Sequence, residues 1–209
     1  MIVDFTTLTA PQAYHLMTQT IVPRPIAWVL TENEADSKRD RYNLAPFSYF
    51  SSVDSNPPTL MISIGQQPDG SSKDTLANIQ RSGELVIHIA STKDIEALNQ
   101  SAATLPYGES ELAASSLTTS PVEGWALPRL SETKIAFSCT LDHLHLIGNT
   151  PQSLVFARVK STYIADEIVC IDEAKGRTIV DAAALDPLAR LGGSNYAFLG
   201  EYISLKRPV

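Results

Sequence analysis

The sequence from Pro23 to Ile79 contains four informative segments, PRPIAWVLT (23–31), NLAPFSYF (43–50), NPPTLMISIG (56–65) and SSKDTLANI (71–79). Apolar runs such as residues 26–31 and 59–65 are typical of buried strands. The segment 43–50 is interrupted by Pro46, which cannot donate a ladder hydrogen bond, so we expect it at a sheet edge. The charged residues 32–42 predict an exposed, hairpin-type loop. This part of the chain therefore predicts neighbouring strands followed by a helix.

Helices are expected on both sides of these strands. Residues 11–17 predict a short helix that opens with a proline, which the first helical turn tolerates. Ser72 is expected to cap a second helix over residues 73–82, and Gly83 suits the position just past its end. A third helix is expected to begin at Thr92.

The second half of the chain is dominated by strand patterns. Strands are expected over residues 84–91, 135–146, 154–165, 167–171 and 196–204, and mostly loop over 105–127. The apolar alternation changes phase at His143, which predicts a β-bulge. Short helices among about seven strands do not suit a doubly wound fold. We expect a mainly β protein, an antiparallel barrel with a few short covering helices.

The composition of the chain argues against several classes of protein. The chain has 209 residues, a formal net charge of −7 and a pI near 5.0. Binding to nucleic-acid backbones needs clustered Lys and Arg, so a nucleic-acid partner is not expected. No apolar run approaches the ~20 residues of a membrane helix, and no segment resembles a signal peptide. Cys139 and Cys170 lack metal-ligand spacing and are expected to be buried, reduced thiols. We expect one domain over residues 1–209 in a cytoplasmic protein without a membrane partner.

The predicted strand, loop and helix over residues 61–78 offer a candidate phosphate site. A helix N-terminus presents unpaired N–H groups and a partial positive charge. Hydroxyl donors and one positive charge come from Ser71, Ser72, Lys73 and Thr75. The glycine spacing of a P-loop is present, but Ser71-Ser72 stand where Lys-Ser/Thr should follow, which excludes a P-loop NTPase. The alternative interpretation is a well-capped surface helix.

Residues 43–50 offer a candidate surface for a planar ring. Because Pro46 donates no backbone hydrogen bond, the backbone groups beside it are available to a ligand. Ala45 and Ser48 are small enough for a ring to approach closely, and Asn43 carries donors and an acceptor. The alternative interpretation is an edge segment whose aromatic side chains pack against the core.

Other signatures are weak or missing. His143 and His145 lie two apart on a predicted strand and can face one side, with Asp142 on the other, but a metal site needs more ligands. His88 lies in an apolar strand and is interpreted as a satisfied core histidine, with a place beside the cofactor pocket as the alternative. The motifs G-x-S-x-G and G-x-G-x-x-G are absent. Residues 190–196 (RLGGSNY) predict a tight turn, or a segment that closes over a cofactor.

Taken in order, six segments resemble the flavin reductase-like family of split barrels, in particular its flavoredoxin-type branch. They are PRPIAWVLT (23–31), NLAPFSYF (43–50), the pair Pro57-Pro58, KDTLANI (73–79), GELVIHIAS (83–91) and ARLGGSNYA (189–197). The resemblance implies an antiparallel split β-barrel that forms a homodimer and binds FMN near the dimer interface. The chain departs from the family at Asn56, where Asp is frequent, and at His88, where Asn is frequent.

The resemblance also implies which residues hold FMN. The isoalloxazine ring would be faced, largely through backbone atoms, by Asn43, Ala45, Pro46, Phe47 and Ser48. Beside the ring or the ribityl chain would run Ser63, Ile64 and Gly65. The phosphate would be held by Ser72, Lys73 and Thr75, with Arg24 a weaker candidate.

The activity that the resemblance implies is hydride transfer from NADH or NADPH to N5 of FMN. The cofactor carries the difficult chemistry and the protein orients it, so no catalytic side chain is assigned. Two alternatives stay open. One is a non-enzymatic FMN-binding electron carrier that a partner protein reduces and that passes electrons to an acceptor protein. The other is a barrel that has lost flavin, against which Asn43, Ser48, Lys73 and Thr75 argue.

Overall fold

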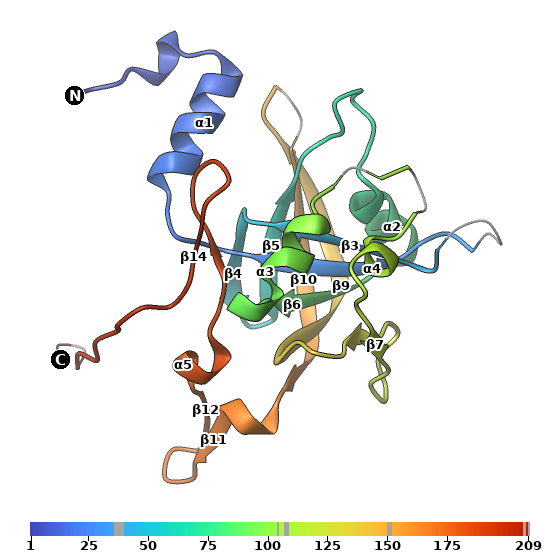
Figure 1. The fold of residues 1–209 in the computed structure, drawn as a ribbon, viewed down its shortest axis with the longest axis vertical. Coiled ribbons are helices and arrows are strands. Elements are labelled where there is room, and N and C mark those ends of the chain that lie inside the picture. Colours follow the sequence, from blue (N-terminus) through green and yellow to red (C-terminus); the bar gives the residue numbers. More distant parts are fainter. Residues whose placement is uncertain (36–39, 104, 107–108, 150–151, 207, 209) are drawn as a thin grey trace.

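The computed structural model describes residues 1–35, 40–103, 105–106, 109–149, 152–206 and 208. Its main strands are β2 (Ala27–Glu32), β3 (Tyr42–Phe47), β4 (Phe50–Ser55), β5 (Pro58–Ile64), β6 (Glu84–Ile89), β9 (Ile135–Ile147) and β10 (Gln152–Ile164). They form one sheet in the order β3-β2-β6-β9-β10-β5-β4, antiparallel at every pairing (Figure 1). The predicted mainly β, antiparallel class is confirmed. The predicted loop 32–42 joins the antiparallel pair β2 and β3, and its residues 36–39 lie outside the described residues.

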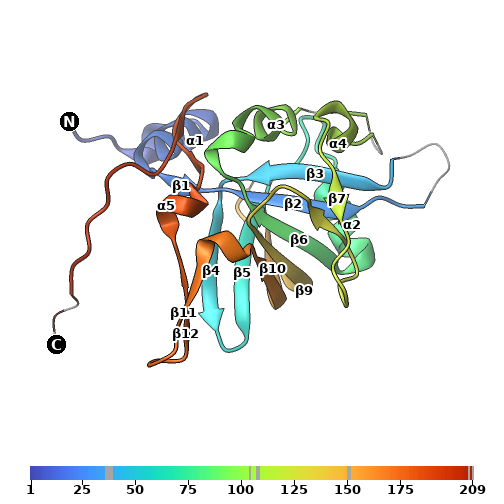
Figure 2. The same ribbon diagram turned by 60° about the horizontal axis from the view of Figure 1, so that its bottom comes forward.

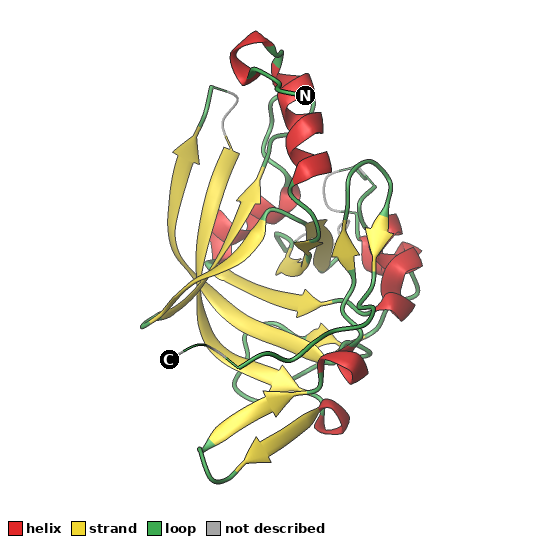
Figure 3. Ribbon diagram, turned by 90° about the vertical axis from the view of Figure 1, so that its left-hand side faces the viewer, coloured by secondary structure: helices red, strands yellow, loops and turns green. Residues whose placement is uncertain are grey.

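The sheet curls into a barrel because its two edge strands are neighbours in sequence. β3 and β4 stand at opposite ends of the strand order, yet only Ser48 and Tyr49 separate them. Three Cα–Cα steps reach at most about 11 Å, so the two edges must approach each other (Figure 3). The carbonyl of Tyr49 accepts a 2.9 Å hydrogen bond from the N–H of Ser63. We call residues 46–49 the seam. Pro46 lies on the edge strand β3, as predicted.

The bulge predicted from the sequence bends the two longest strands. Phe156 pairs with His143 and Ala157 with Leu141, so Asp142 is the extra residue on β9. The bulge lies where the apolar alternation changes phase, and the prediction is confirmed. The expectation that Asp142 and His143 face opposite sides is wrong, because the bulge interrupts the alternation. Their side chains meet, with 2.8 Å between Asp142 Oδ2 and His143 Nδ1.

Short helices cover the barrel (Figure 2). They are η1 (Phe5–Thr7), α1 (Ala10–Thr20), α2 (Asp74–Ser82), η2 (Thr92–Asp94), α3 (Ile95–Gln100), α4 (Glu111–Ala114), η3 (Asp166–Ile168) and α5 (Ala182–Leu185). α1 is longer than predicted, and a capping box between Thr9 and Gln12 closes its N-terminus. Among the described residues, no helix has the length and apolar character needed to cross a membrane.

The N-terminus of α2 differs from the prediction. Lys73, not Ser72, occupies the N-cap position, and no side chain caps the helix there. Ser72 instead forms an isolated β-bridge with Gln66, which holds it outside the helix. Gly83 ends α2 in the left-handed conformation at φ 73°, as predicted. The first N–H groups of α2 are therefore not closed by an N-cap side chain.

Three small sheets complete the fold. They are β1 (Arg24–Pro25) with β13 (Ala189–Arg190) and β14 (Tyr196–Ala197), β11 (Val169–Asp172) with β12 (Arg177–Val180), and β7 (Thr119–Ser120) with β8 (Arg129–Leu130). The predicted strand 196–204 is wrong beyond Ala197. In the described residues that follow, the chain has no strand partner and exposes Phe198, Tyr202 and Ile203.

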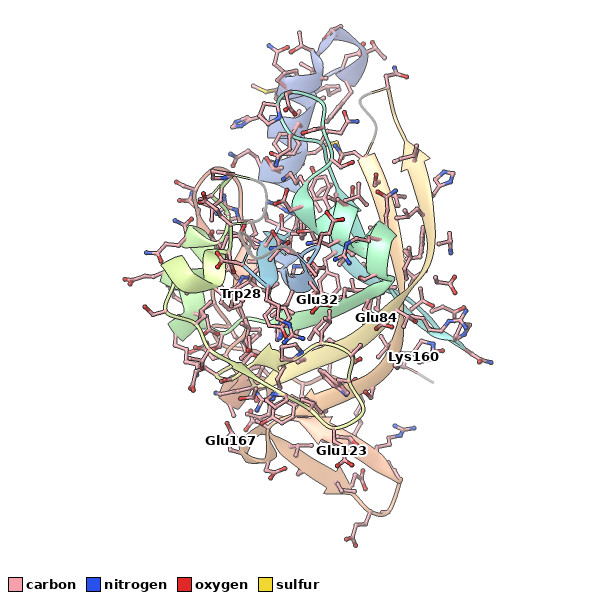
Figure 4. All side chains as sticks on the ribbon, turned by 90° about the vertical axis from the view of Figure 1, so that its right-hand side faces the viewer. Trp28, Glu32, Glu84, Glu123, Lys160 and Glu167 are labelled. Atoms are coloured by element: carbon pink, nitrogen blue, oxygen red, sulfur yellow. The ribbon has the colours of Figure 1, made fainter. Side chains whose placement is uncertain are left out.

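β2 is buried on both faces, which explains its uninterrupted apolar sequence. Val29 packs inside the barrel with residues of β5, β6 and α2. Trp28 packs outward against Leu98 of α3, and its indole N–H donates a 2.8 Å hydrogen bond to Ser101 Oγ. The two faces of β2 thus belong to different parts of the core. Figure 4 shows Trp28 apart from the charged side chains Glu84 and Lys160, which lie close together.

The two cysteines differ in environment. Cys139 lies in the barrel interior, where burial raises the pKa of its thiol to about 12. Cys170 lies on β11 and is exposed. The prediction of two buried thiols is therefore right for Cys139 and wrong for Cys170, because β11 belongs to a two-stranded hairpin outside the barrel.

Candidate functional site

Three cavities meet at the seam, and Pro46 lines all of them. The large cavity, of about 540 Å³, lies between α1, the seam and the end of β5. The inner cavity, of about 150 Å³, lies between β3, the start of α2, the end of α3 and Glu111 of α4. The hairpin cavity, of about 190 Å³, lies between the seam, α3 and the β13–β14 hairpin. The seam is therefore the place where a ligand can contact strands from both edges of the barrel.

The alternation of β5 decides which of its residues face the large cavity. Ser63 and Gly65 line it, while Ile64 points into the barrel core and is fully buried. Ile64 can therefore offer a ligand only backbone atoms. A Cβ at Gly65 would lie 3.1 Å from Nε2 of Gln152, so glycine keeps this wall open. The structure brings Ser48, Ser63 and Gly65 together around the large cavity.

Lys73 lies between the large and the inner cavity. It lines both, and its Nζ lies 5.7 Å from the centroid of the Phe47 ring. Its position at the N-cap of α2 adds the partial positive charge of the helix start. Ser72 lines a different cavity, of about 550 Å³, on the 67–72 loop. Ser72 and Lys73, two of the three residues predicted to hold the phosphate, are therefore adjacent in sequence but face different cavities.

The inner cavity is polar. Asn43 Nδ2 donates a 2.9 Å hydrogen bond to Thr75 Oγ1, and both side chains are buried. Glu111 Oε2 accepts a 3.0 Å hydrogen bond from the N–H of Leu44. Burial raises the pKa of Glu111, and the nearby Asp74 raises it further. Ala45 and Phe47 also line this cavity, so β3 presents its predicted ring-facing residues there.

Arg24 is buried beneath the seam and is held by backbone groups. Its Nη1 donates to the carbonyls of Thr18 and Ile21, each at 2.7 Å, and its Nη2 to that of Leu191 at 2.9 Å. Its Nε lies 3.4 Å from Ser48 Oγ. These contacts join the end of α1, the seam and the β13–β14 hairpin. They favour a positioning role for Arg24 over contact with a phosphate.

His88 is a satisfied core histidine, as predicted. Its Nδ1 lies 2.9 Å from the carbonyl of Trp28, and its Nε2 accepts a 2.9 Å hydrogen bond from the N–H of Leu130. Complete burial lowers the pKa of His88 to about 4, so the ring is neutral at pH 7. In the described part of the chain, no group of three or more His, Cys, Asp or Glu could hold a metal.

Several lining residues are not identifiable from the sequence. Glu111 reaches the inner cavity from a four-residue helix within a segment predicted as loop. Tyr14 and Met17 reach the large cavity from α1, and Gln152 reaches it from the start of β10. Their spacing relative to the seam follows no local pattern, because tertiary contacts alone bring them there. The RLGGSNY segment (190–196) is different, because its sequence indicated a turn that could close over a cofactor. Its Arg190 and Tyr196 line the hairpin cavity.

Comparison with known proteins agrees with this architecture. Residues 17–171 match the family model described as "Flavin reductase like domain". An uncharacterized protein of Halalkalibacterium halodurans is 36% identical over 205 residues, which cover 96% of this chain and 93% of that protein. The nitrilotriacetate monooxygenase component B of Bacillus cereus superposes with a TM-score of 0.86 at 34% identity, over 98% of each chain.

A second solved structure bears on the fold alone. A protein with a split barrel domain from Shewanella frigidimarina superposes with a TM-score of 0.81 at 20% identity, over the whole of both chains. The sheet that closes at the seam is the split barrel of these proteins. The chain therefore belongs to the flavin reductase-like family of FMN-binding split barrels.

Proposed function

We propose that this protein is an FMN-binding oxidoreductase that takes electrons from NADH or NADPH. The observation that carries the proposal is the convergence of three cavities on the seam, with Lys73 between two of them. Family membership supports FMN as the cofactor. The nicotinamide donor is the further step that the experiment below tests.

The residues at the seam fit FMN. The large cavity, of about 540 Å³, lies within the range of roughly 300–1,000 Å³ typical of cofactor sites. We place the isoalloxazine ring along the backbone of residues 45–48, with Ser63 and Gly65 on its other side. We place the phosphate at Lys73 and the first N–H groups of α2, since a helix N-terminus favours an anion. We assign Thr75 an indirect part in this arrangement, because its side chain is buried and its hydroxyl accepts a hydrogen bond from the amide of Asn43.

The residues of the chain orient the cofactor rather than react with it. The chemistry would be supplied by FMN when it is bound, as the acceptor of a hydride from a reduced nicotinamide. The seam fixes the position of the ring, and the α1 side chains Tyr14 and Met17 form one wall of the large cavity. Proximity and orientation supply much of such a rate, so the site needs no acid–base pair.

We also propose that two copies associate through α1 and the C-terminal segment. Tyr14 on α1 is 62% exposed although it borders the large cavity, and Tyr202 and Ile203 are 63% and 83% exposed. Both segments lie on the same side of the barrel (Figure 1). We take these exposed apolar side chains as the surface that the second copy covers. Light scattering should give twice the 22.7 kDa chain mass, and a monomer would contradict this proposal.

The experiment that tests the function is a visible absorption spectrum of the purified protein, followed by anaerobic addition of NADH and, separately, NADPH. A flavin spectrum that either nucleotide bleaches within seconds supports the oxidoreductase. A flavin spectrum that neither nucleotide bleaches contradicts it and favours an electron carrier reduced by a partner protein. A colourless protein that fails to bind added FMN contradicts both.

A further inference from the structure

The inner cavity contains a buried carboxyl group next to the place proposed for the phosphate of FMN. Glu111 reaches the cavity from α4, and its side chain is buried. Its Oε2 accepts the 3.0 Å hydrogen bond from the N–H of Leu44 on β3. If Glu111 turned away, that buried N–H would lose its partner, which carries a cost in free energy. The bond therefore holds the carboxyl group at the barrel edge, where it lines the cavity.

The side chains that line the inner cavity carry more negative than positive charge. Among the described residues, its titratable side chains are Lys73, Asp74 and Glu111. The two carboxylates outnumber the one ammonium group when all three are ionised. Burial raises the pKa of Glu111, and repulsion by Asp74 raises it further. The cavity therefore favours a proton on Glu111 even before a ligand adds charge.

The other charged and titratable groups around α4 lie outside the cavity. Asp40 is exposed, and its Oδ2 accepts a 2.8 Å hydrogen bond from the N–H of Ser110. Glu109 is exposed as well. At the start of β3, the exposed guanidinium of Arg41 lies over the ring of Tyr42. None of these four titratable side chains lines the inner cavity, so Lys73, Asp74 and Glu111 set its charge.

A phosphate at Lys73 would add negative charge to these three groups. A phosphate monoester carries about −1.5 to −2 charges at pH 7. A sphere of about 150 Å³, the volume of the cavity, is about 7 Å across, which is less than the ~8 Å over which physiological salt screens charges. The single charge of Lys73 cannot balance a phosphate and two carboxylates. Protonation of Glu111 relieves the repulsion, and a neutral carboxyl group still accepts the hydrogen bond from Leu44.

We propose that FMN binding is linked to the uptake of a proton by Glu111, so that the protein holds FMN more tightly at lower pH. The proton comes from the solvent and returns to it when FMN leaves. Glu111 acts through its charge on the phosphate and needs no contact with the cofactor. The inference rests on the proposed function, because it takes the phosphate of FMN to lie at Lys73.

The sign of the pH dependence follows from the repulsion. The phosphate disfavours the charged form of Glu111, so the pKa of Glu111 is higher in the FMN complex than in the free protein. At low pH the carboxyl group is protonated in both forms and does not affect the affinity. As the pH rises, the free protein loses this proton first, and the affinity for FMN falls until the complex loses it too.

Titration by flavin fluorescence quenching tests the proposal, with FMN and riboflavin as ligands. Glu111→Gln removes the charge and keeps an acceptor for the N–H of Leu44. Between about pH 5.5 and pH 8, the wild type should lose about tenfold more FMN affinity than Glu111→Gln. The phosphate of FMN also titrates, at a pKa of about 6, but it does so with both proteins and cancels in the comparison. Riboflavin lacks the phosphate, so its affinity should depend on pH equally in both proteins.

Calorimetry gives a second measurement, which the wild type alone can supply if Glu111→Gln does not fold. Titrations in two buffers that differ in ionisation enthalpy count the protons exchanged on binding. Lys73 favours the fully ionised phosphate, which by itself would release protons. The wild type should nevertheless take up protons when it binds FMN within this pH range. A net release at every pH in the range would overturn the proposal.

Glu109→Gln is the matched control, because it removes an equal but exposed charge two residues from Glu111. It should bind both flavins as the wild type does at each pH. An FMN affinity with the same pH dependence in the wild type and in Glu111→Gln overturns the proposal and leaves the proposed function standing. An effect of Glu111 that riboflavin shares also overturns it, because the phosphate is then not the charge that Glu111 senses. A protein that binds neither flavin contradicts the proposed function, and this inference with it.

Discussion

The side-chain amide of Asn43 is hydrogen-bonded to the hydroxyl of Thr75, with 2.9 Å between Nδ2 and Oγ1. Asn43 lies on the edge strand β3 and Thr75 in the first turn of α2. One turn further along α2, the amide of Asn78 donates to Thr31 and Asn33. These buried bonds fix the helix against the barrel edge, and they thereby hold Lys73, at the start of α2, beside the seam.

Replacing Thr75 by Val keeps the shape of the side chain but removes the acceptor. The amide of Asn43 then stays buried without a partner, so the free energy of unfolding should fall by about 1–3 kcal/mol. Urea unfolding measures this loss, and Thr75→Ser should recover most of it. The bond also holds β3, whose backbone we place beside the ring, so Thr75→Val should weaken binding of FMN and of riboflavin alike. If Thr75 contacts the phosphate directly, only FMN binding suffers.

Lys73→Ala should weaken FMN binding about 10- to 100-fold, the usual effect of removing one charged hydrogen-bond partner. Riboflavin lacks the phosphate, so its affinity should stay unchanged. Titration by flavin fluorescence quenching measures both. Lys175→Ala, on the exposed β11–β12 hairpin, is the matched control and should bind both flavins as the wild type does. An equal loss of FMN and riboflavin affinity in Lys73→Ala would place the phosphate elsewhere.

Arg24→Lys should destabilise the fold by about 3 kcal/mol, because one compact ammonium group cannot donate hydrogen bonds to all the carbonyls that the planar guanidinium contacts. Those carbonyls belong to Thr18, Ile21 and Leu191. Chemical denaturation measures the loss, with the exposed Arg177→Lys as the control. The ratio of FMN to riboflavin affinity should not change. A selective loss of FMN affinity would show that Arg24 holds the phosphate after all.

Local patterns were sufficient to predict the barrel strands, because each buried strand carries its own periodicity. The phase change at His143 even located the bulge at Asp142. The C-terminal strand was overpredicted beyond Ala197, since its apolar residues find no strand to pair with in the described structure. Apolar character alone does not distinguish a strand from a segment whose partner lies elsewhere.

The candidate site was predicted only where it coincides with a local motif. The seam and Lys73 lie in contiguous segments, so the sequence identifies them. Ser72 was misplaced because its bridge to Gln66, rather than helix capping, fixes its position. Glu111 reaches its cavity through packing of distant elements, and no spacing rule encodes such a contact.

His88 should make the fold sensitive to acid. Its pKa is lowered from 6.5 to about 4 in the folded protein, because burial disfavours the charged ring. Well above pH 6.5 the His88 ring is neutral in both the folded and the unfolded states, so it does not make the free energy of unfolding depend on pH there. Between pH 6.5 and 4 only the unfolded state takes up the proton. The free energy of unfolding should therefore fall by about 2 kcal/mol between pH 7 and pH 5.

His88→Gln separates this contribution from that of other groups. Glutamine does not titrate, so the variant should lose about 2 kcal/mol less than the wild type between pH 7 and pH 5, although it is less stable at pH 7. Urea unfolding at the two pH values measures the difference. Glu111 acts in the opposite sense, because burial raises its pKa and so favours the folded state as the pH falls, and it is common to both proteins. An identical pH dependence in wild type and variant would mean that His88 is protonated in the folded state near its ordinary pKa.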